Sequence, residues 1–169
     1  LLDRGFAVLC EKPMADRLDA CAAVLDRASG GAQFALVHQM RFDPAVELLA
    51  VLLREGQLGE VRTVDISFGN PFGWLSRTGF YRSESLAGGG VVTDLGCHLL
   101  DLCMFLFGRP TIERAAAIFE PRGRRMDLAA TIEFSLAGGG RGTIRTSRIA
   151  NLSKGVAVAC EHGTAVAAI

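Results

Sequence analysis

Residues 6–37 read FAVLCEKPMADRLDACAAVLDRASGGAQFALV, and this stretch decides the fold class of the first part of the chain. Phe6–Cys10 and Gln33–Val37 are short apolar runs that predict buried strands. The residues between them predict a helix that has Asp16 as its N-cap and ends at Gly30. One face of this helix would carry Leu18, Cys21, Ala22, Leu25 and Ala28. Strand, helix and strand within ~35 residues predict a βαβ unit with parallel strands and a right-handed crossover.

Beyond Asp43-Pro44, which interrupts the pattern, the chain reads as an α+β domain. The pattern predicts a helix over Ala45–Glu55, a strand over Val61–Phe68, a long loop over Gly69–Gly90 and a helix over Val92–Phe107. The remainder reads as a run of strands. These are Ile112–Phe119, Leu128–Leu136, Thr143–Ile149, Val156–Cys160 and Ala165–Ile169.

Composition narrows the class of protein. Half of the 169 residues are hydrophobic and 21% are charged, which favours a folded core and excludes a disordered chain. Eighteen basic residues balance eighteen acidic ones, so the net charge does not indicate binding to nucleic acid or to an anionic membrane. No apolar run approaches ~20 residues, and we expect no segment that spans a bilayer.

Cysteines and chain ends add two expectations. The five cysteines form no CxxC pair and are expected to be free thiols in a reducing cytosol. The chain begins at Leu1 with residues typical of a helix end, so we expect an internal fragment of a longer protein.

Glu11-Lys12-Pro13 directly follows the first predicted strand. Open α/β sheets bind ligands at the carboxyl ends of their strands. Lys12 is therefore a candidate to donate to a substrate oxygen and to stabilise a developing alkoxide. Pro13 fixes the turn, and its peptide bond is a candidate for cis geometry. The alternative is an ordinary charged turn.

Asp94, His98 and Asp101 are spaced i, i+4 and i+7 and would share one face of the helix predicted over Val92–Phe107. An apolar stripe lies beside them, formed by Leu95, Leu99, Leu102 and Leu106. A histidine oriented by carboxylates suits a general acid or base, and Gly88-Gly89-Gly90 would let the backbone approach a ligand. The alternative is a structural pair of His98 with Asp101. A metal site is less favoured, because Asp94 and His98 supply only two ligands.

His38, Gln39 and Arg41 follow the second predicted parallel strand, so we expect them at the same sheet edge as Lys12. They are candidates to line one cleft. The alternative for Arg41 is an ion pair that bridges two domains. His162 falls in a predicted hairpin turn, like Gly138-Gly139-Gly140, and is interpreted as a turn residue.

Several late strands are apolar at both parities, as in AATIEF (129–134) and GVAVAC (155–160). Helices on one face of such a sheet would leave a second apolar face uncovered. We therefore expect the sheet to contact another copy of the chain. The alternative is a sheet buried within one chain.

The motifs AVLCEKPMA, HQMRFDPAV, GQLGEV and LAGGGVVTDLGCHLLDL occur in this order and together resemble the Gfo/Idh/MocA oxidoreductases, the family of glucose–fructose oxidoreductase and inositol dehydrogenase. EKP with RFDP and GGGxxxDxxxHxxD makes this a specific signal, and it covers nearly the whole chain. The resemblance implies that residues 1–42 are the C-terminal part of a Rossmann-type parallel sheet that binds NAD or NADP. Residues 43–169 would then form an α+β domain with an open, mainly antiparallel sheet that makes oligomer contacts.

The resemblance also implies roles for single residues. Lys12, Asp94 and His98 match the family's catalytic residues, and His98 would be the acid or base of the DxxxH pair. The cofactor-binding candidates are Glu11, Lys12, Pro13, and Tyr81-Arg82, which stands where many members have Trp-Arg. The substrate-binding candidates are Gln39, which stands where Asn is common, Arg41, Trp74 in the aromatic loop, Asp94 and His98.

The implied activity is hydride transfer between a nicotinamide and a sugar, polyol or related secondary alcohol. Two alternatives stay open: NAD-assisted glycoside hydrolysis, and a non-catalytic binding or assembly module. The chain contains no GxGxxG motif, so its residues do not decide between NAD and NADP, and the chain alone is expected to be inactive. The expected partners are a small sugar or polyol and further copies of the chain, without nucleic acid, membrane or metal, in the cytoplasm.

Overall fold

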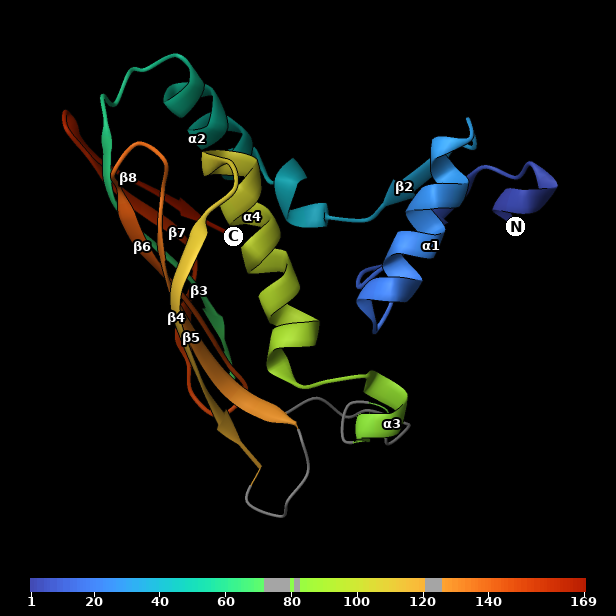
Figure 1. Ribbon diagram of the computed structural model, residues 1–169. Coiled ribbons are helices and arrows are strands. Elements are labelled where there is room, and N and C mark those ends of the chain that lie inside the picture. The colour runs from blue at the N-terminus through green and yellow to red at the C-terminus, as the bar shows by residue number, and fades with distance from the viewer. Residues whose placement is uncertain (72–79, 81–82, 121–125) are drawn as a thin grey trace. The chain divides into compact units, whose positions relative to one another are not determined.

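The computed structural model describes residues 1–71, 80, 83–120 and 126–169. The chain forms two compact units, Leu1–Gln39 and Met40–Ile169 (Figure 1).

The first unit is the predicted βαβ element. It contains η1 (Leu2–Arg4), β1 (Val8–Cys10), α1 (Leu18–Ser29) and β2 (Phe34–Leu36). The two strands pair in parallel, with Val8 opposite Phe34 and Cys10 opposite Leu36. The predicted parallel pairing is therefore confirmed.

The start and the apolar face of α1 differ from the prediction. The N-cap is Arg17, whose backbone is extended, so the helix begins too late for Asp16 to cap it. Asp19 in the first turn instead accepts hydrogen bonds from the Arg17 side chain and, at 3.0 Å, from the Ala20 amide. The face that the pattern predicts to be apolar is open to solvent in this unit, since Leu18 and Leu25 are exposed.

The second unit begins with η2 (Gln39–Phe42), which straddles the boundary, and α2 (Pro44–Arg54). Asp43-Pro44 begins α2 rather than only interrupting the chain: Pro44 occupies the first helical position, and the Asp43 carboxylate accepts from the Ala45 amide at 2.9 Å. The remaining helical segments are α3 (Glu84–Ala87), η4 (Val92–Gly96) and α4 (Cys97–Phe107).

A six-stranded sheet makes up the rest of the second unit (Figure 1). Its strands are β3 (Val61–Gly69), β4 (Thr111–Phe119), β5 (Asp127–Ser135), β6 (Arg141–Ser147), β7 (Leu152–Cys160) and β8 (Gly163–Ala168). The order is β4-β5-β6-β3-β7-β8, and every pair is antiparallel except β3 with β6. The sheet is thus mainly antiparallel, as predicted.

Helices α2 and α4 cover one face of this sheet (Figure 1). The core between them is formed by fully buried apolar side chains, which include Val46, Leu99, Leu102, Ile66, Phe134, Ile144, Val156 and Val158. Each such side chain contributes ~1.5–3 kcal/mol of hydrophobic stabilisation, so this layer fixes the position of α4 on the sheet.

The opposite face of the sheet is not apolar along its central strands. Asp65 of β3 and Arg145 of β6 form an ion pair at 2.9 Å, and both side chains are over two-fifths exposed. On β5, Thr131 and Glu133 alternate with the core residue Ile132, so they lie on this opposite face. The interpretation of AATIEF as apolar at both parities is therefore wrong, because one parity carries threonine and glutamate, while the contact with another copy of the chain stays a prediction.

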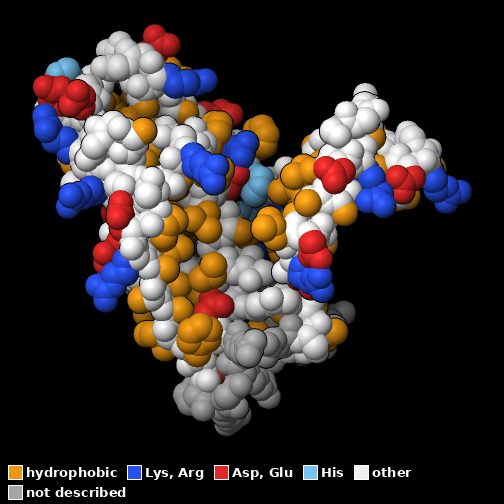
Figure 2. All heavy atoms as spheres, in the orientation of Figure 1, with side chains coloured by type: hydrophobic (Ala, Val, Ile, Leu, Met, Phe, Trp, Pro, Cys, Tyr) orange, Lys and Arg blue, Asp and Glu red, His pale blue; other side chains and the backbone are white. Residues whose placement is uncertain are grey.

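Apolar exposure is instead found at the edge strand β4. Every residue of β4 is exposed, and Ile112, Ile118 and Phe119 are among its large apolar side chains. Figure 2 shows hydrophobic side chains gathered in the region of β4 and α4. An exposed apolar edge strand is a surface that proteins usually cover or pair.

One helical stretch, Ser85–Phe107, is long and apolar enough by composition to cross a membrane, among the described residues. Its second half is α4, whose core contacts and buried polar residues are those of a core helix, and core helices pass the same test. The expectation that no segment spans a bilayer stays a prediction.

Candidate active site

Helix α4 places His98 and Asp101 against the core of the second unit. Both residues are buried, next to Leu99, Leu102 and Cys103. The helix is apolar around most of its circumference, which is the pattern of a buried helix. The buried polar side chains His98 and Asp101 are therefore surrounded by packed apolar side chains.

The residues before α4 do not continue the α-helix. Val92–Gly96 form a π-helical turn, in which the Cys97 amide bonds to the Val92 carbonyl five residues back. The wider turn accommodates one additional residue, so Asp94 no longer keeps the ideal i, i+4 relation to His98. The predicted helix over Val92–Phe107 is therefore confirmed in its bounds, and its first turn is π-helical instead of α-helical.

Asp94 is bound by a residue that the sequence analysis did not single out. The Arg148 guanidinium donates through Nη2 to Oδ2 of Asp94. Arg148 follows β6 and lies 54 residues further along the chain. No local pattern links two residues so far apart, and only the folded sheet brings them together.

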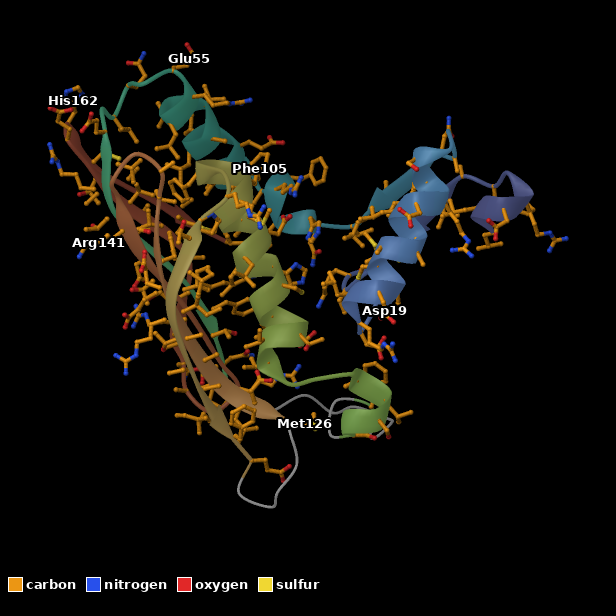
Figure 3. All side chains as sticks on the ribbon, in the orientation of Figure 1. Asp19, Glu55, Phe105, Met126, Arg141 and His162 are labelled. Atoms are coloured by element: carbon orange, nitrogen blue, oxygen red, sulfur yellow. The ribbon has the colours of Figure 1, made fainter. Side chains whose placement is uncertain are left out.

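Asp101 is engaged by Arg41. Nε of Arg41 donates to Oδ2 of Asp101 at 2.8 Å, and Nη2 donates to Oδ1, so the contact is bidentate. The hydrogen bond to Asp101 raises the pKa of Arg41 further above its usual range. The guanidinium also lies 5.4 Å from the ring centroid of Phe105 (Figure 3). This geometry supports the ion-pair alternative for Arg41, although both partners belong to the second unit.

The start of the helical segment is fixed from another strand. The Asp127 carboxylate, at the beginning of β5, accepts from the amides of Gly90 at 3.2 Å and Val92 at 2.7 Å. A Cβ on Gly90 would collide with the backbone of Asp127. Gly90 is thus required for close packing on Asp127, a reason different from the predicted approach of a ligand.

The remaining candidates lie in the first unit. Glu11 is exposed and Lys12 is half-buried directly after β1, and the Lys12–Pro13 peptide bond is cis, as anticipated. The Val37 amide donates to the Cys10 carbonyl at 2.8 Å, so the residues that follow β1 and β2 leave the sheet at one edge. His38 is half-buried and Gln39 exposed at the end of this unit. That Lys12 and His98 meet at one cleft stays a prediction.

Several predicted site residues contribute nothing to the description of the candidate active site. Trp74, Tyr81 and Arg82 lie outside the described residues. Among the residues that the structure does describe, no three His, Cys, Asp or Glu side chains are grouped so that they could hold a metal ion. His162 is exposed in the turn between β7 and β8 (Figure 3).

Comparison with known proteins gives matches over most of the chain. Residues 46–166 match the model of the GFO/IDH/MocA C-terminal domain. Trans-1,2-dihydrobenzene-1,2-diol dehydrogenase of Bos taurus is 33% identical over 165 residues, which cover 97% of this chain and 48% of that protein. D-apiose dehydrogenase of Paraburkholderia graminis is 34% identical over 114 residues, 66% of this chain and 29% of that enzyme.

The fold is also found in solved structures. Levoglucosan dehydrogenase in complex with NADH and levoglucosan superposes with a TM-score of 0.86 at 20% identity, and the match covers 99% of this chain and 49% of that one. The chain thus spans about half the length of the curated relatives that match nearly all of it.

Proposed function

Because this chain belongs to the GFO/IDH/MocA family, we propose that it forms the catalytic half of an NAD(P)-dependent dehydrogenase. The substrate is a sugar, polyol or related secondary alcohol. The observation that carries this proposal is the buried His98 on α4, which follows the Arg148-bound Asp94 at the spacing of the family's DxxxH motif. The names of the relatives support it, since they are dehydrogenases of a diol and of a sugar.

The first unit supplies the residues that would face the nicotinamide. Glu11, Lys12 and Pro13 follow β1 at the carboxyl edge of two parallel strands, the place where open α/β sheets bind dinucleotides. This edge therefore fits the reactive end of the cofactor, and Tyr81 and Arg82 are proposed as further contacts. When bound, the nicotinamide accepts or returns the hydride of the reaction. NADH in the levoglucosan dehydrogenase structure supports this choice of cofactor.

The proton of the reacting hydroxyl is assigned to His98. Its imidazole takes the proton during oxidation and returns it during reduction. Asp94 orients the hydroxyl and the imidazole, while the Lys12 ammonium stabilises the developing alkoxide. These roles require Lys12 and His98 to reach the same carbon.

Substrate recognition is proposed for Gln39 and Trp74, which remain candidates on the resemblance. For Arg41 we favour a structural ion pair over substrate binding, because two nitrogens of its guanidinium are bound to Asp101. We also propose that the enzyme is a cytoplasmic homo-oligomer that uses the sheet of the second unit. The exposed apolar edge strand β4 supports such a contact.

Steady-state kinetics of the full-length protein test the assignment of His98. His98→Asn is expected to lower kcat by ~10²–10⁴ because the base that moves the proton is lost. The dissociation constant of NAD(P)H, measured by nicotinamide fluorescence, should change by less than about two-fold, since dinucleotides are held mainly by backbone amides. His162→Asn is the matched control, because His162 is exposed in a hairpin turn, and its kcat should equal that of the wild type.

Lys12→Met should lower kcat and also raise the KM for the alcohol, because the ammonium charge is present in the ground state and in the transition state. An H98N variant with wild-type turnover would refute the proposed mechanism. The NAD-assisted hydrolase would be favoured by two results together. The protein would produce no net NAD(P)H with any sugar, polyol or trans-diol, and it would hydrolyse a glycoside. A structure of the holoenzyme with Lys12 and His98 more than ~12 Å apart would exclude a shared substrate carbon.

A further inference from the structure

The turn that follows β6 is unusually well fixed. The Ser147 hydroxyl is buried and accepts from the amides of Ile149 at 3.1 Å and Ala150 at 3.0 Å. The Arg148 amide donates to the Leu128 carbonyl at 2.8 Å, and the Asn70 amide donates to the Ser147 carbonyl at 3.1 Å. These two hydrogen bonds hold both polar groups of the Ser147–Arg148 peptide.

The side chain of Arg148 is nearly as constrained as its backbone. It is 10% exposed, and that of its partner Asp94 is 26% exposed. A guanidinium loses much hydration when it is buried to this degree, and such burial persists only where a partner compensates it. The pair of Asp65 on β3 and Arg145 on β6 is 42% and 44% exposed and stays in contact with water. The two aspartate–arginine pairs thus share their chemistry and differ in burial.

A second anchor acts on the same helical segment. Asp127 binds the amides of Gly90 and Val92 directly before Asp94. Ala129 of β5 is opposite Ser147 of β6, so Asp127 and Arg148 leave the sheet at the same end of this strand pair. One end of the β5–β6 pair therefore holds both the start of the helical segment and its carboxylate.

We propose that Arg148 is a positioning residue of the active site, which fixes the carboxylate of Asp94 in the π-helical turn before His98. This proposal rests on the proposed function of Asp94 and His98. Arg148 acts through Asp94 and does not itself touch the reacting atoms. Asp94 lies within the π-helical turn, and Arg148 donates to its carboxylate.

The chemistry explains why arginine stands at this position. The planar guanidinium is permanently charged and holds a carboxylate in a defined orientation, which a flexible ammonium does less well. Catalysis by an oriented carboxylate is sensitive to displacement, because a shift of ~1 Å can reduce the rate by ~10². Removal of Arg148 should therefore affect turnover far more than cofactor binding.

The test compares Arg148→Met and Arg148→Lys in the full-length protein with Arg145→Met as the matched control. R148M is expected to lower kcat about 10- to 100-fold, with the NAD(P)H dissociation constant within about two-fold of wild type. R148K should recover part of the loss, and R145M should retain wild-type kcat. Light scattering on each variant identifies any change of assembly. The double variant D94N/R148M should lose no more activity than D94N alone, since both substitutions remove one interaction.

Hydrogen exchange supplies a readout that does not depend on activity. The amides of residues 92–96 should exchange at least about ten-fold faster in R148M than in wild type, and at the wild-type rate in R145M. If the wild type has no dehydrogenase activity, the proposed function fails and the exchange result alone decides the positioning role. If R148M does not fold, R148K, which retains the charge, decides by the same two measurements. Any one of three results would overturn the proposal. The first is a wild-type kcat in both R148K and R148M, and the second is an unchanged exchange rate at residues 92–96. The third is a loss of activity in the double variant that equals the sum of the losses in the two single variants.

Discussion

The ion pair between Arg41 and Asp101 gives a prediction in which the two single substitutions have unequal effects. The Asp101 side chain is 9% exposed, whereas that of Arg41 is 41% exposed. Arg41→Met leaves a buried carboxylate without its guanidinium. Asp101→Asn leaves a guanidinium that is already in contact with water. We expect R41M to destabilise the protein more than D101N.

The magnitudes follow from burial. Removal of one partner from a fully buried pair costs ~3–5 kcal/mol, because a charge stays behind without compensation. Arg41 is over two-fifths exposed, so water reaches the pair and we reduce this to about 2–3 kcal/mol. D101N removes charge-assisted hydrogen bonds but leaves no buried charge, and we expect about 1 kcal/mol. The double variant R41M/D101N should resemble D101N, since it contains no buried carboxylate either.

Urea unfolding of the full-length protein measures these free energies, and hydrogen exchange of the α4 amides reports the same loss locally. R17M is a suitable control, because the Arg17–Asp19 pair is exposed and should contribute little. A D101N variant at least as destabilised as R41M, or a loss below ~0.5 kcal/mol in R41M, would refute the reasoning from burial.

Three further predictions concern the core. Burial raises the pKa of Cys103 from 9.0 to about 12, so at pH 8 the thiolate fraction is ~10⁻⁴ instead of ~10⁻¹. Mass spectrometry should find iodoacetamide on half-buried Cys21 in the native protein but on Cys103 only after denaturation, and equal labelling rates would contradict this. Gly142→Ala should destabilise by ~1–3 kcal/mol, because the new Cβ meets the ring of Phe134. The urea midpoint measures this loss, and an unchanged midpoint would show that the ring moves freely. Leu102→Ala should cost ~2–5 kcal/mol in the same assay, since Leu102 is fully buried, and a loss under ~1 kcal/mol would mean that the core closes over the cavity.

The spacing of the apolar residues and the positions of Gly, Pro and Asp were sufficient to predict most elements of the fold. The glycines 138–140 separate two predicted strands, and β5 and β6 indeed form an antiparallel pair around them. Asp43-Pro44 carries both signals of a helix start, a cap and a proline at the first position. These features are local, because each depends on residues within one or two turns of the chain.

The parts that the sequence did not predict depend on distant contacts. The π-helical turn over Val92–Gly96 is held by Asp127 and Arg148, which follow it by dozens of residues. Arg148 follows β6 three residues after Arg145 and falls on the parity of the core residue Ile144, so alternation separates the two arginines but does not identify the carboxylate that either one binds. Only the folded chain decides that Arg148 meets Asp94 and that Arg145 meets Asp65.

The central place of β3 has a consequence for biosynthesis. This strand is translated before either of its neighbours, since both β6 and β7 follow it, and the paired residues Asp65 and Arg145 are 80 positions apart. At ~5–20 residues per second, both edges of β3 stay open on the ribosome for several seconds. Such long-range pairing is also slow to form. We therefore expect proteolysis of stalled nascent chains to cleave within residues 61–69 until β7 has left the exit tunnel. Protection of β3 in chains that end before β6 would contradict this order of assembly.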